Sequence, residues 1–269
     1  MKIITMLFLL TSLAFSKDYY SKVEPYELRT ISSNVTGLVL YIDENSIGKK
    51  LDSKAFIKID SQLDRDELRF TKQKLVYLKE TVSLNKNILK NLEISLGKKR
   101  DNYKKIEALK IKSRVEKDRE FYDLIGSENS YLNTQKEIIN LKKQITDLNL
   151  RKAQLSRSIN DKNLKAKGFI LYSIDVKVGQ VVTLLTPLAT VADVSKALLT
   201  IYLDGEDVSD AKRSVIYING EKTDYKIDRL LTIADTKSIS KYMAQIIIKS
   251  PKVFSKLVKI ELRKATDAN

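Results

Sequence analysis

Two stretches of this chain resemble each other, and a long segment of helix-forming sequence lies between them. The first, from Gly37 to Gly48, reads GLVLYIDENSIG, and the second, from Gly168 to Gly179, reads GFILYSIDVKVG. A repeated strand-and-turn unit cannot bury its own apolar face, so each copy needs a partner, and the natural partner is the other copy. If the copies pack together, the segment between them has to leave the body and return. The sequence therefore predicts a hairpin between the two copies.

The central segment is predicted to form two long helices. Between Gln62 and Gly168 the only glycines are Gly97 and Gly126, and there is no proline. Its apolar residues follow alternating steps of three and four, the seven-residue repeat of a coiled coil. On the first helix this seam comprises Leu68, Leu75, Leu78, Val82, Asn85, Leu89, Leu92, Leu96, Lys99, Tyr103 and Ile106. On the return helix it comprises Ile138, Leu141, Ile145, Leu148, Lys152, Leu155 and Ile159.

Capping patterns indicate where the two helices begin. Ser61 followed by Asp64, and Ser113 followed by Glu116, both match the spacing of a helix start at which the serine caps the first turn. The turn of the hairpin is therefore expected near residues 110–113, with antiparallel arms of about 45 to 50 residues. At 1.5 Å per residue each arm would reach on the order of 70 Å. A compact core does not need that length, so the hairpin is expected to project.

The remaining segments read as short strands and turns. Residues 31–60 and 168–194 are expected to close into one small β-sandwich, and the hairpin at 61–167 is inserted in it. Residues 195–265 carry several strands, an Asn-Gly turn at 219–220 and a short helix near 206–212, which is typical of a small β-barrel. An extended segment at 17–30 could add to the barrel. A short tail at 266–269 ends the chain.

Composition and the N-terminal residues restrict the function. Residues 1–16 combine an early lysine, a short apolar run and a small-x-small ending, which predicts a cleavable signal peptide and export. The chain contains no cysteine and no histidine, so neither a lipid carried on a cysteine nor a metal or thiol site is expected. No phosphate-binding loop or dinucleotide-binding turn is present. We therefore expect no enzymatic activity and no cofactor.

The positive charge allows several partners. The net charge is +15, and residues 62–165 alone hold 25 Lys and Arg against 15 Asp and Glu. Nucleic acid would be the usual inference from such an excess, but export argues against it. An acidic partner surface fits equally well, and a solvated helix with no partner at all is the plain alternative.

The order of these segments resembles the periplasmic adaptor proteins, also called membrane fusion proteins or the HlyD-like family, of Gram-negative efflux pumps and type I secretion systems. The half-motif with Ile31, Gly37 and Gly48, the coiled-coil hairpin, the half-motif with Gly179 and the barrel strands follow one another in the family's order. The resemblance implies an elongated multidomain α+β protein. Its hairpin would be inserted in a split biotinyl/lipoyl-like β-sandwich, and a small β-barrel would follow. Structural turn glycines are expected at Gly37, Gly48, Gly168 and Gly179.

The resemblance also implies the partners. Adaptors of this family bridge an inner-membrane transporter, of the RND or ABC type, to an outer-membrane channel of the TolC type. The hairpin tip meets the channel and the barrel side meets the transporter. A homo-oligomer of three to six copies in the periplasm is expected, peripheral to the membrane, without nucleic acid and without a lipid anchor.

The tip supplies the candidate contact residues. Family tips resemble Arg, then Leu four residues later, then Ser seven further on. Here those places hold Lys105, Leu109 and Glu116, with an apolar Val115 beside the last. Leu109 alone matches outright, since Lys105 lacks the bidentate fork of Arg and Glu116 replaces a hydroxyl with an anion.

The tip residues also have plain explanations. Glu116 fits as the capping partner of Ser113, Leu109 as the end of the seam, and Lys105 as a solvated lysine near a helix C-terminus. For the whole chain, the alternative function is an exported basic coiled-coil protein that binds acidic polymers or anionic membrane surfaces.

Overall fold

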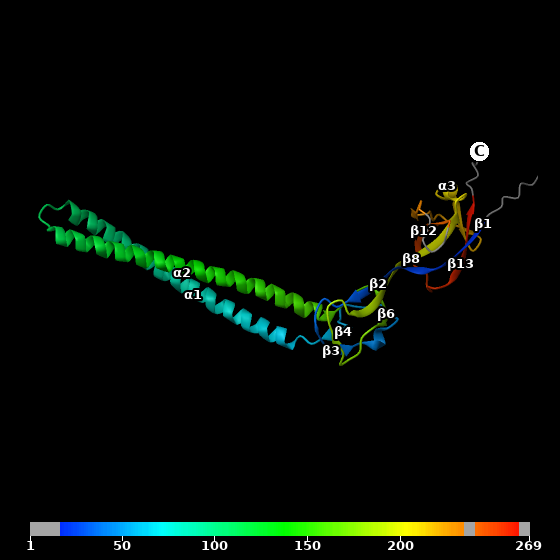
Figure 1. The fold of residues 1–269 in the computed structure, drawn as a ribbon, viewed down its shortest axis with the longest axis horizontal. Coiled ribbons are helices and arrows are strands. Elements are labelled where there is room, and N and C mark those ends of the chain that lie inside the picture. Colours follow the sequence, from blue (N-terminus) through cyan, green and yellow to red (C-terminus); the bar gives the residue numbers. More distant parts are fainter. Residues whose placement is uncertain (1–16, 234–239, 264–269) are drawn as a thin grey trace, which may run out of the picture.

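The computed structural model describes residues 17–233 and 240–263 and shows an elongated molecule (Figure 1). A helical hairpin occupies one end, and antiparallel sheets occupy the middle and the other end. The C-terminal strand lies in the sheets farthest from the hairpin tip. The expected signal peptide (1–16) and tail (266–269) fall outside the described residues.

The hairpin consists of α1 (Gln62–Ala108) and α2 (Arg114–Asp161), of 47 and 48 residues. The predicted arm lengths and turn position are confirmed. The two helices run antiparallel side by side along most of their length (Figure 1). Seam residues that become buried between them are Leu75, Val82, Leu96, Ile138, Leu141 and Leu155, as the seven-residue repeat predicts. Thr71 is buried too. It is a polar residue at the seam position between Leu68 and Leu75 in the same repeat.

One of the two predicted helix caps is formed. The Ser113 hydroxyl accepts from the Glu116 N–H, and the Glu116 carboxylate accepts from the Ser113 N–H at 3.0 Å. The prediction for Ser61 was wrong, because its side chain makes no capping hydrogen bond. The Asp60 carboxylate accepts from the Gln62 N–H instead, at 2.9 Å.

Asp64, the expected partner of Ser61, faces the other helix. Its carboxylate accepts from the Ser158 hydroxyl at 2.8 Å and pairs with Lys162 Nζ at 2.9 Å. Burial works against the charged form, but these two donors prevail and hold the pKa of Asp64 below its ordinary value. The side chain therefore ties the two helices together at the base of the hairpin.

Short strands hold the base of the hairpin closed. The strands of this part of the molecule are β3 (Gly37–Ile42), β4 (Ile57–Ile59), β5 (Asn163–Leu164), β6 (Ile170–Ile174) and β7 (Val181–Val182), with a 3-10 turn η1 (Glu44–Ser46) after β3. Four of them form a sheet in the order β5-β4-β3-β7. Because β4 directly precedes α1 and β5 directly follows α2, their pairing brings the two helix ends together.

The two similar stretches pack against each other, as predicted from their repetition. The Gly179 N–H donates to the Val39 carbonyl at 2.9 Å, and the Gly48 N–H donates to the Leu171 carbonyl at 2.8 Å. Each turn glycine thus bonds to the buried strand residue of the other copy. Val39 of the first copy and Leu171 and Val176 of the second share one core with Phe56, Ile57, Val182 and Leu188 from the adjoining segments.

A residue-by-residue alignment of the two sequences does not match the structural positions of the two copies. That alignment pairs Leu40 with Leu171, but Leu40 is exposed, and Val39 takes the buried place that corresponds to Leu171. The first copy has one residue more between its buried strand position and its glycine, and the turn η1 lies in that interval.

Two long strands connect this part to the far end. They are β2 (Glu24–Ser32) and β8 (Pro187–Asp204), which pair antiparallel with register shifts between Pro25 and Glu27 and between Ile31 and Ser32. The expected boundary between residues 194 and 195 falls inside β8, which continues without a break.

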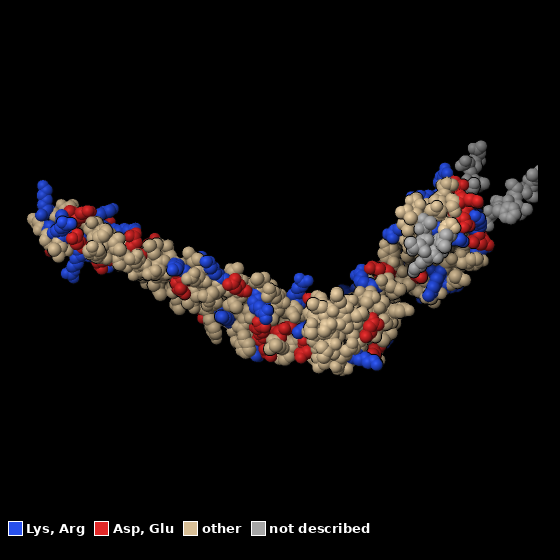
Figure 2. Space-filling view, in the orientation of Figure 1, with Lys and Arg blue, Asp and Glu red and all other residues tan. Residues whose placement is uncertain are grey.

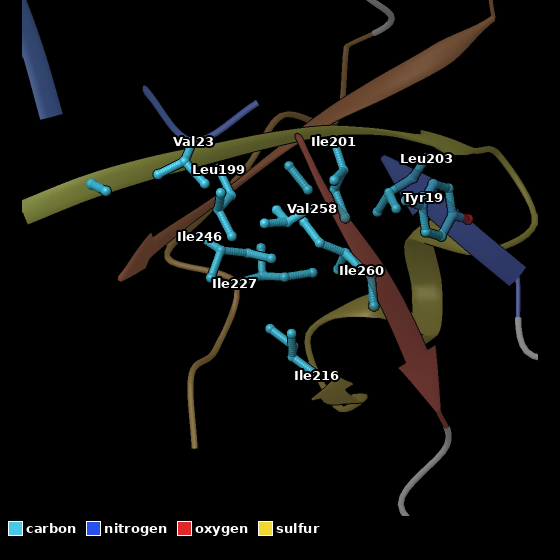
Figure 3. Packing of buried hydrophobic residues seen from close by; sticks show 13 residues of the cluster. Tyr19, Val23, Leu199, Ile201, Leu203, Ile216, Ile227, Ile246, Val258 and Ile260 are labelled. Atoms are coloured by element: carbon cyan, nitrogen blue, oxygen red, sulfur yellow. The ribbon is translucent and has the colours of Figure 1, made fainter. Parts of the chain in front are cut away.

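The far end contains two sheets around a second core. Its further elements are β1 (Lys17–Lys22), α3 (Val208–Ala211), β9 (Val215–Ile218), β10 (Glu221–Lys222), β11 (Arg229–Leu230), β12 (Lys241–Lys249) and β13 (Leu257–Arg263). One sheet has the order β1-β13-β9-β10, and the other has the order β11-β12-β8-β2. Side chains of both sheets point into the same apolar cluster, among them Tyr19, Leu199, Ile201, Ile216, Ile246 and Ile260 (Figure 3). The N-terminal strand β1 joins this part through β13, with Lys17 opposite Leu262.

Gly37 is not a turn glycine, so that prediction was wrong. It is the first residue of β3, and a Cβ built on it would lie 2.7 Å from Ile59 Cγ2. The residue has to be glycine because β4 approaches closely, and not because of its backbone angles. Gly48, Gly168 and Gly179 do have positive φ values of 77°, 93° and 86°, as turn glycines require.

Candidate docking site at the hairpin tip

The tip is a short, well-fixed turn between the two helices. α1 ends at Ala108 and α2 begins at Arg114, which leaves five linking residues. The capping box of Ser113 and Glu116 fixes the start of α2. The ammonium of Lys117 donates to the Glu107 carbonyl at 2.9 Å and so satisfies an otherwise unpaired carbonyl at the end of α1. Contacts from both helices therefore hold the turn in one shape.

Glu116 is fully engaged inside this turn. One oxygen accepts from Lys112 Nζ at 2.8 Å, and the other accepts from the Ser113 N–H and hydroxyl. Lys112 first, and then Ser113, lower the pKa of Glu116 to about 2. These bonds support a structural role for Glu116 in the turn.

Three apolar side chains project from the turn into solvent. Leu109 is 43% exposed, Val115 is 78% exposed and Ile111 is 89% exposed. Lys110, Lys112 and Arg114 alternate with them along the chain. Of the predicted tip residues, the structure thus brings Leu109 and Val115 to the apex. Lys105 lies one turn back, in the last turn of α1, where its charge favours the negative helix end.

Ile111 is a candidate contact residue that sequence reasoning missed. An isolated β-branched residue between two lysines, in a segment already assigned to the turn, was the available signal. Among the residues that the structure describes, almost none of its side-chain surface is covered, since Ile111 is 89% exposed. A cluster of large apolar side chains exposed to solvent is typical of an interaction site.

An aromatic group lies just behind the apex. The rings of Tyr103 and Phe121 have centroids 5.7 Å apart, and Phe121 stands edge-on to Tyr122 at the same separation. Tyr103 donates from its hydroxyl to Glu107 at 3.3 Å. Desolvation, followed by the nearby Glu107, raises the pKa of Tyr103. Tyr122 is largely exposed, so the group adds aromatic surface to the side of the tip.

The charge of the tip is mixed with an excess of cations. From residue 104 to residue 119 there are seven Lys or Arg and three Asp or Glu. Lys and Arg side chains gather at the hairpin end in the space-filling view (Figure 2). An apolar centre with a cationic border suits a partner surface that is apolar in the middle and acidic at its edge.

The described residues hold no group of three or more His, Cys, Asp or Glu that could bind a metal ion. No helix in the described part of the chain is long and apolar enough to cross a membrane.

The fold of this chain is similar to that of several proteins of known structure. MacA from Actinobacillus actinomycetemcomitans is similar over 92% of this chain and 78% of its own, with a TM-score of 0.66 and 18% identity. The membrane fusion protein Spr0693 from Streptococcus pneumoniae R6 is similar over 93% of this chain and its whole length, with a TM-score of 0.60 and 8% identity. A MacA–MexA chimera that contains the α-hairpin domain of Pseudomonas aeruginosa MexA gives a TM-score of 0.58 at 15% identity, over 93% of this chain and 82% of its own.

No protein-family model and no curated protein matches the sequence. The structural likeness nevertheless extends over nearly the whole chain, so this protein has the fold of the membrane fusion proteins, the periplasmic adaptor class.

Proposed function

We propose that this chain is a periplasmic adaptor that couples an inner-membrane transporter to a TolC-type outer-membrane channel. The observation that carries the proposal is the projecting hairpin with an exposed apolar apex at Leu109, Ile111 and Val115. A rod held away from the body at one end of the molecule suits a bridge, and an apolar apex at its end suits a docking contact.

The two β parts would have separate roles. The sandwich built from both similar stretches would be the split lipoyl-like domain, since the hairpin is inserted between β4 and β5. The two sheets around the second core would be the small β-barrel, and this end would meet the transporter of the RND or ABC class. The domain limits expected from the sequence stay predictions. The limit between residues 194 and 195 is the exception, because the strand β8 crosses it.

Affinity at one tip is expected to be modest. An apex of a few side chains buries much less than the 1,200 to 2,000 Å² of typical stable interfaces. Several copies acting together would raise the overall affinity by multivalency, so we propose a homo-oligomer of three to six copies in the periplasm. The role would be structural, without catalysis and without a cofactor.

Photo-crosslinking from the tip tests this function. A photoreactive amino acid at Ile111 should capture an outer-membrane channel in the native cell, because this side chain is the most exposed apolar group of the turn. The same amino acid at Ile94, an exposed position in α1 away from the turn, is the matched control and should capture none. Absence of any outer-membrane channel among the Ile111 products would reject the docking assignment.

The alternative function makes the opposite prediction. A basic coiled coil that binds acidic polymers or anionic membranes would lose affinity steeply with salt, and changes at the apex would have little effect on it. Ile111→Ser should therefore leave that binding intact, whereas it should weaken channel capture.

A further inference from the structure

A row of evenly spaced cations runs along one face of the hairpin. Arg65, Lys72, Lys79 and Lys86 follow one another on α1 at intervals of seven residues, and all four are exposed. Seven residues make nearly two full helical turns, so these side chains lie in one line, the basic row. Neighbouring members are roughly 10 Å apart along the helix, and the row is roughly 30 Å long.

The basic row has no acidic neighbours on its own helix, all of which the structure describes. Side chains three or four residues apart are neighbours on a helix surface. No Asp or Glu stands three or four residues before or after any member of the row. Within residues 17–233 and 240–263, none of the four makes an ion pair. The positions four residues after each member border the row and hold Arg69, Val76, Ser83 and Lys90.

The facing helix does not neutralise the row either. Arg100, fourteen residues after Lys86, continues the line toward the tip and pairs with Glu128 of α2 at 2.6 Å. This pair identifies the positions of α2 on the same face, since they recur from Glu128 at intervals of seven. They hold Gln135, Lys142, Asn149 and Ser156, none of which is acidic. An ion pair therefore forms where α2 supplies an acid, and along the basic row it supplies a further cation instead.

The opposite face of the hairpin is electrically balanced over the same stretch. Glu67 pairs there with Arg151 at 2.6 Å. The lines of seven-residue spacing that pass through these two residues contain one further charge each, Lys74 on α1 and Glu137 on α2. Two cations thus face two anions on this side. The positive excess at mid-length belongs to the face with the basic row.

The spacing of the row selects an extended ligand. Cations about 10 Å apart cannot converge on one small anion, but a long chain of anions can contact all of them. Nucleic acid fits poorly, because the exposed rings of Phe70 and Tyr77 lie two residues before Lys72 and Lys79, about 200° around the helix, where bases could not stack on them. A membrane surface fits poorly too, since Val76 is the single apolar side chain bordering the row on α1.

We propose that the basic row, together with Lys142, binds a linear anionic polymer that lies lengthwise along the hairpin. The polymer carries an anionic group, phosphate or carboxylate, on each repeat unit. Each contact is a weak exposed ion pair, and the row gains its affinity from several contacts at once and from the release of counterions. This binding goes beyond the proposed function and does not depend on it, because the apex of the tip takes no part.

Binding of labelled inorganic polyphosphate and of labelled polygalacturonate to the purified protein tests the proposal. The first probe carries phosphates and the second carboxylates, so their relative affinities show which anion the face prefers. The triple variant Lys72→Gln, Lys79→Gln and Lys86→Gln should bind the preferred probe about tenfold more weakly, or less. It should also lower the slope of log affinity against log salt by about two, because three ion contacts are lost.

A second triple variant is the matched control. Lys98→Gln, Lys136→Gln and Lys143→Gln remove the same charge from exposed positions of the hairpin off this face, and binding should fall by less than about threefold. Equal losses in the two variants would overturn the proposal, because net charge alone would then account for binding. Failure of both probes to bind the unaltered protein at about 50 mM salt would overturn it as well. Tighter binding to phosphatidylglycerol vesicles than to either polymer would show that the occupant is a membrane.

A further variant neutralises the row without removing a lysine. Asn149→Glu with Ser156→Glu places acids on the facing positions of α2, as Glu128 already stands for Arg100. These acids should pair with members of the basic row and so weaken polymer binding, without lowering the thermal midpoint of the hairpin. Undiminished polymer binding in this variant would overturn the proposal. Circular dichroism at 222 nm should be unchanged in every variant, because glutamine and glutamate are good helix formers.

These outcomes are independent of channel docking. If the protein is not an adaptor, capture at Ile111 fails, while the two triple variants still differ in polymer binding. If it is an adaptor whose hairpin binds no polymer, capture succeeds and the two triple variants behave alike. Ile111→Ser should leave polymer binding unchanged in either case.

Discussion

Gly37 shows how a single hydrogen atom in place of a side chain permits the packing of the repeated segments. The first strand of one copy passes so close to β4 that a Cβ at this position would meet Ile59 Cγ2 at 2.7 Å. Ile59 is itself buried, so its side chain cannot move aside freely to make room for a Cβ at position 37.

Gly37→Ala should therefore destabilise the protein. We expect the free energy of unfolding in urea to fall by about 1 to 3 kcal/mol, the usual cost of overpacking a core. Gly97→Ala is the control, because that glycine lies on an exposed helical position with open space around it. It should raise the free energy of helix unfolding by about 0.5 to 1 kcal/mol. Equal effects of the two substitutions would contradict the close approach.

Glu116 makes the tip sensitive to acid. Its pKa in the folded protein is about 2, below the ordinary value of 4.5. A lowered pKa means that the ionised group stabilises the fold above about pH 4.5 and that this stabilisation is lost as the pH falls toward 2. Carboxyl NMR titration should show the low pKa directly, and the first turn of α2 should fray over the same pH range.

The Lys112→Ala variant tests the cause of the lowered pKa of Glu116. Because Lys112 is the main cause of the lowered value, its loss should move the pKa of Glu116 upward. A pKa of Glu116 that stays at its ordinary value in the unaltered protein would contradict the capping box.

At the scale of elements, the hairpin depends on one narrow seam. Its helices are exposed over most of their surface, and the buried cluster at mid-length consists of Val82, Ile138 and Leu141 with a few partly buried neighbours. Little else holds the two arms together there, so each buried side chain matters more than its size alone suggests.

Ile138→Ala should cost about 2 kcal/mol or more of hairpin stability, since it opens a cavity in this seam. Ile94→Ala removes the same atoms from an exposed position of α1 and should change stability by no more than about 0.5 kcal/mol. Thermal unfolding followed by circular dichroism at 222 nm measures both. Similar losses in the two variants would mean that the observed seam is not the one that holds the arms.

The elements that could be predicted from the sequence were those with a short-range pattern. The seven-residue repeat gave the helices and the seam, and the Ser113–Glu116 spacing gave the cap. The matching pattern at Ser61 failed because the partners of Asp64 are Ser158 and Lys162, far along the chain. No local rule could anticipate that contact.

Two features of the site and fold needed three-dimensional information for the same reason. Ile111 became a candidate only when the turn showed it to be almost wholly exposed. The role of Gly37 depends on Ile59 of another strand. In the repeated segments, the turn η1 shifts the buried position from Leu40 to Val39, although the letters align without a gap.

At the scale of the whole molecule, the reciprocal pairing of the two similar stretches determines the shape. Gly48 bonds to Leu171 and Gly179 bonds to Val39, while β4 and β5 pair beneath the helices. Because both ends are fixed in this way, the two helices between them form an antiparallel hairpin that projects from the body. Docking at the tip presupposes that projecting hairpin.

Small-angle X-ray scattering on the monomer fraction from size-exclusion chromatography tests this claim most directly. A compact chain of 269 residues would have a radius of gyration of about 18 Å. The projecting hairpin, with helices of roughly 70 Å, predicts a value well above that and a long tail in the distance distribution. A radius of gyration near 18 Å with a symmetric distance distribution would contradict the account.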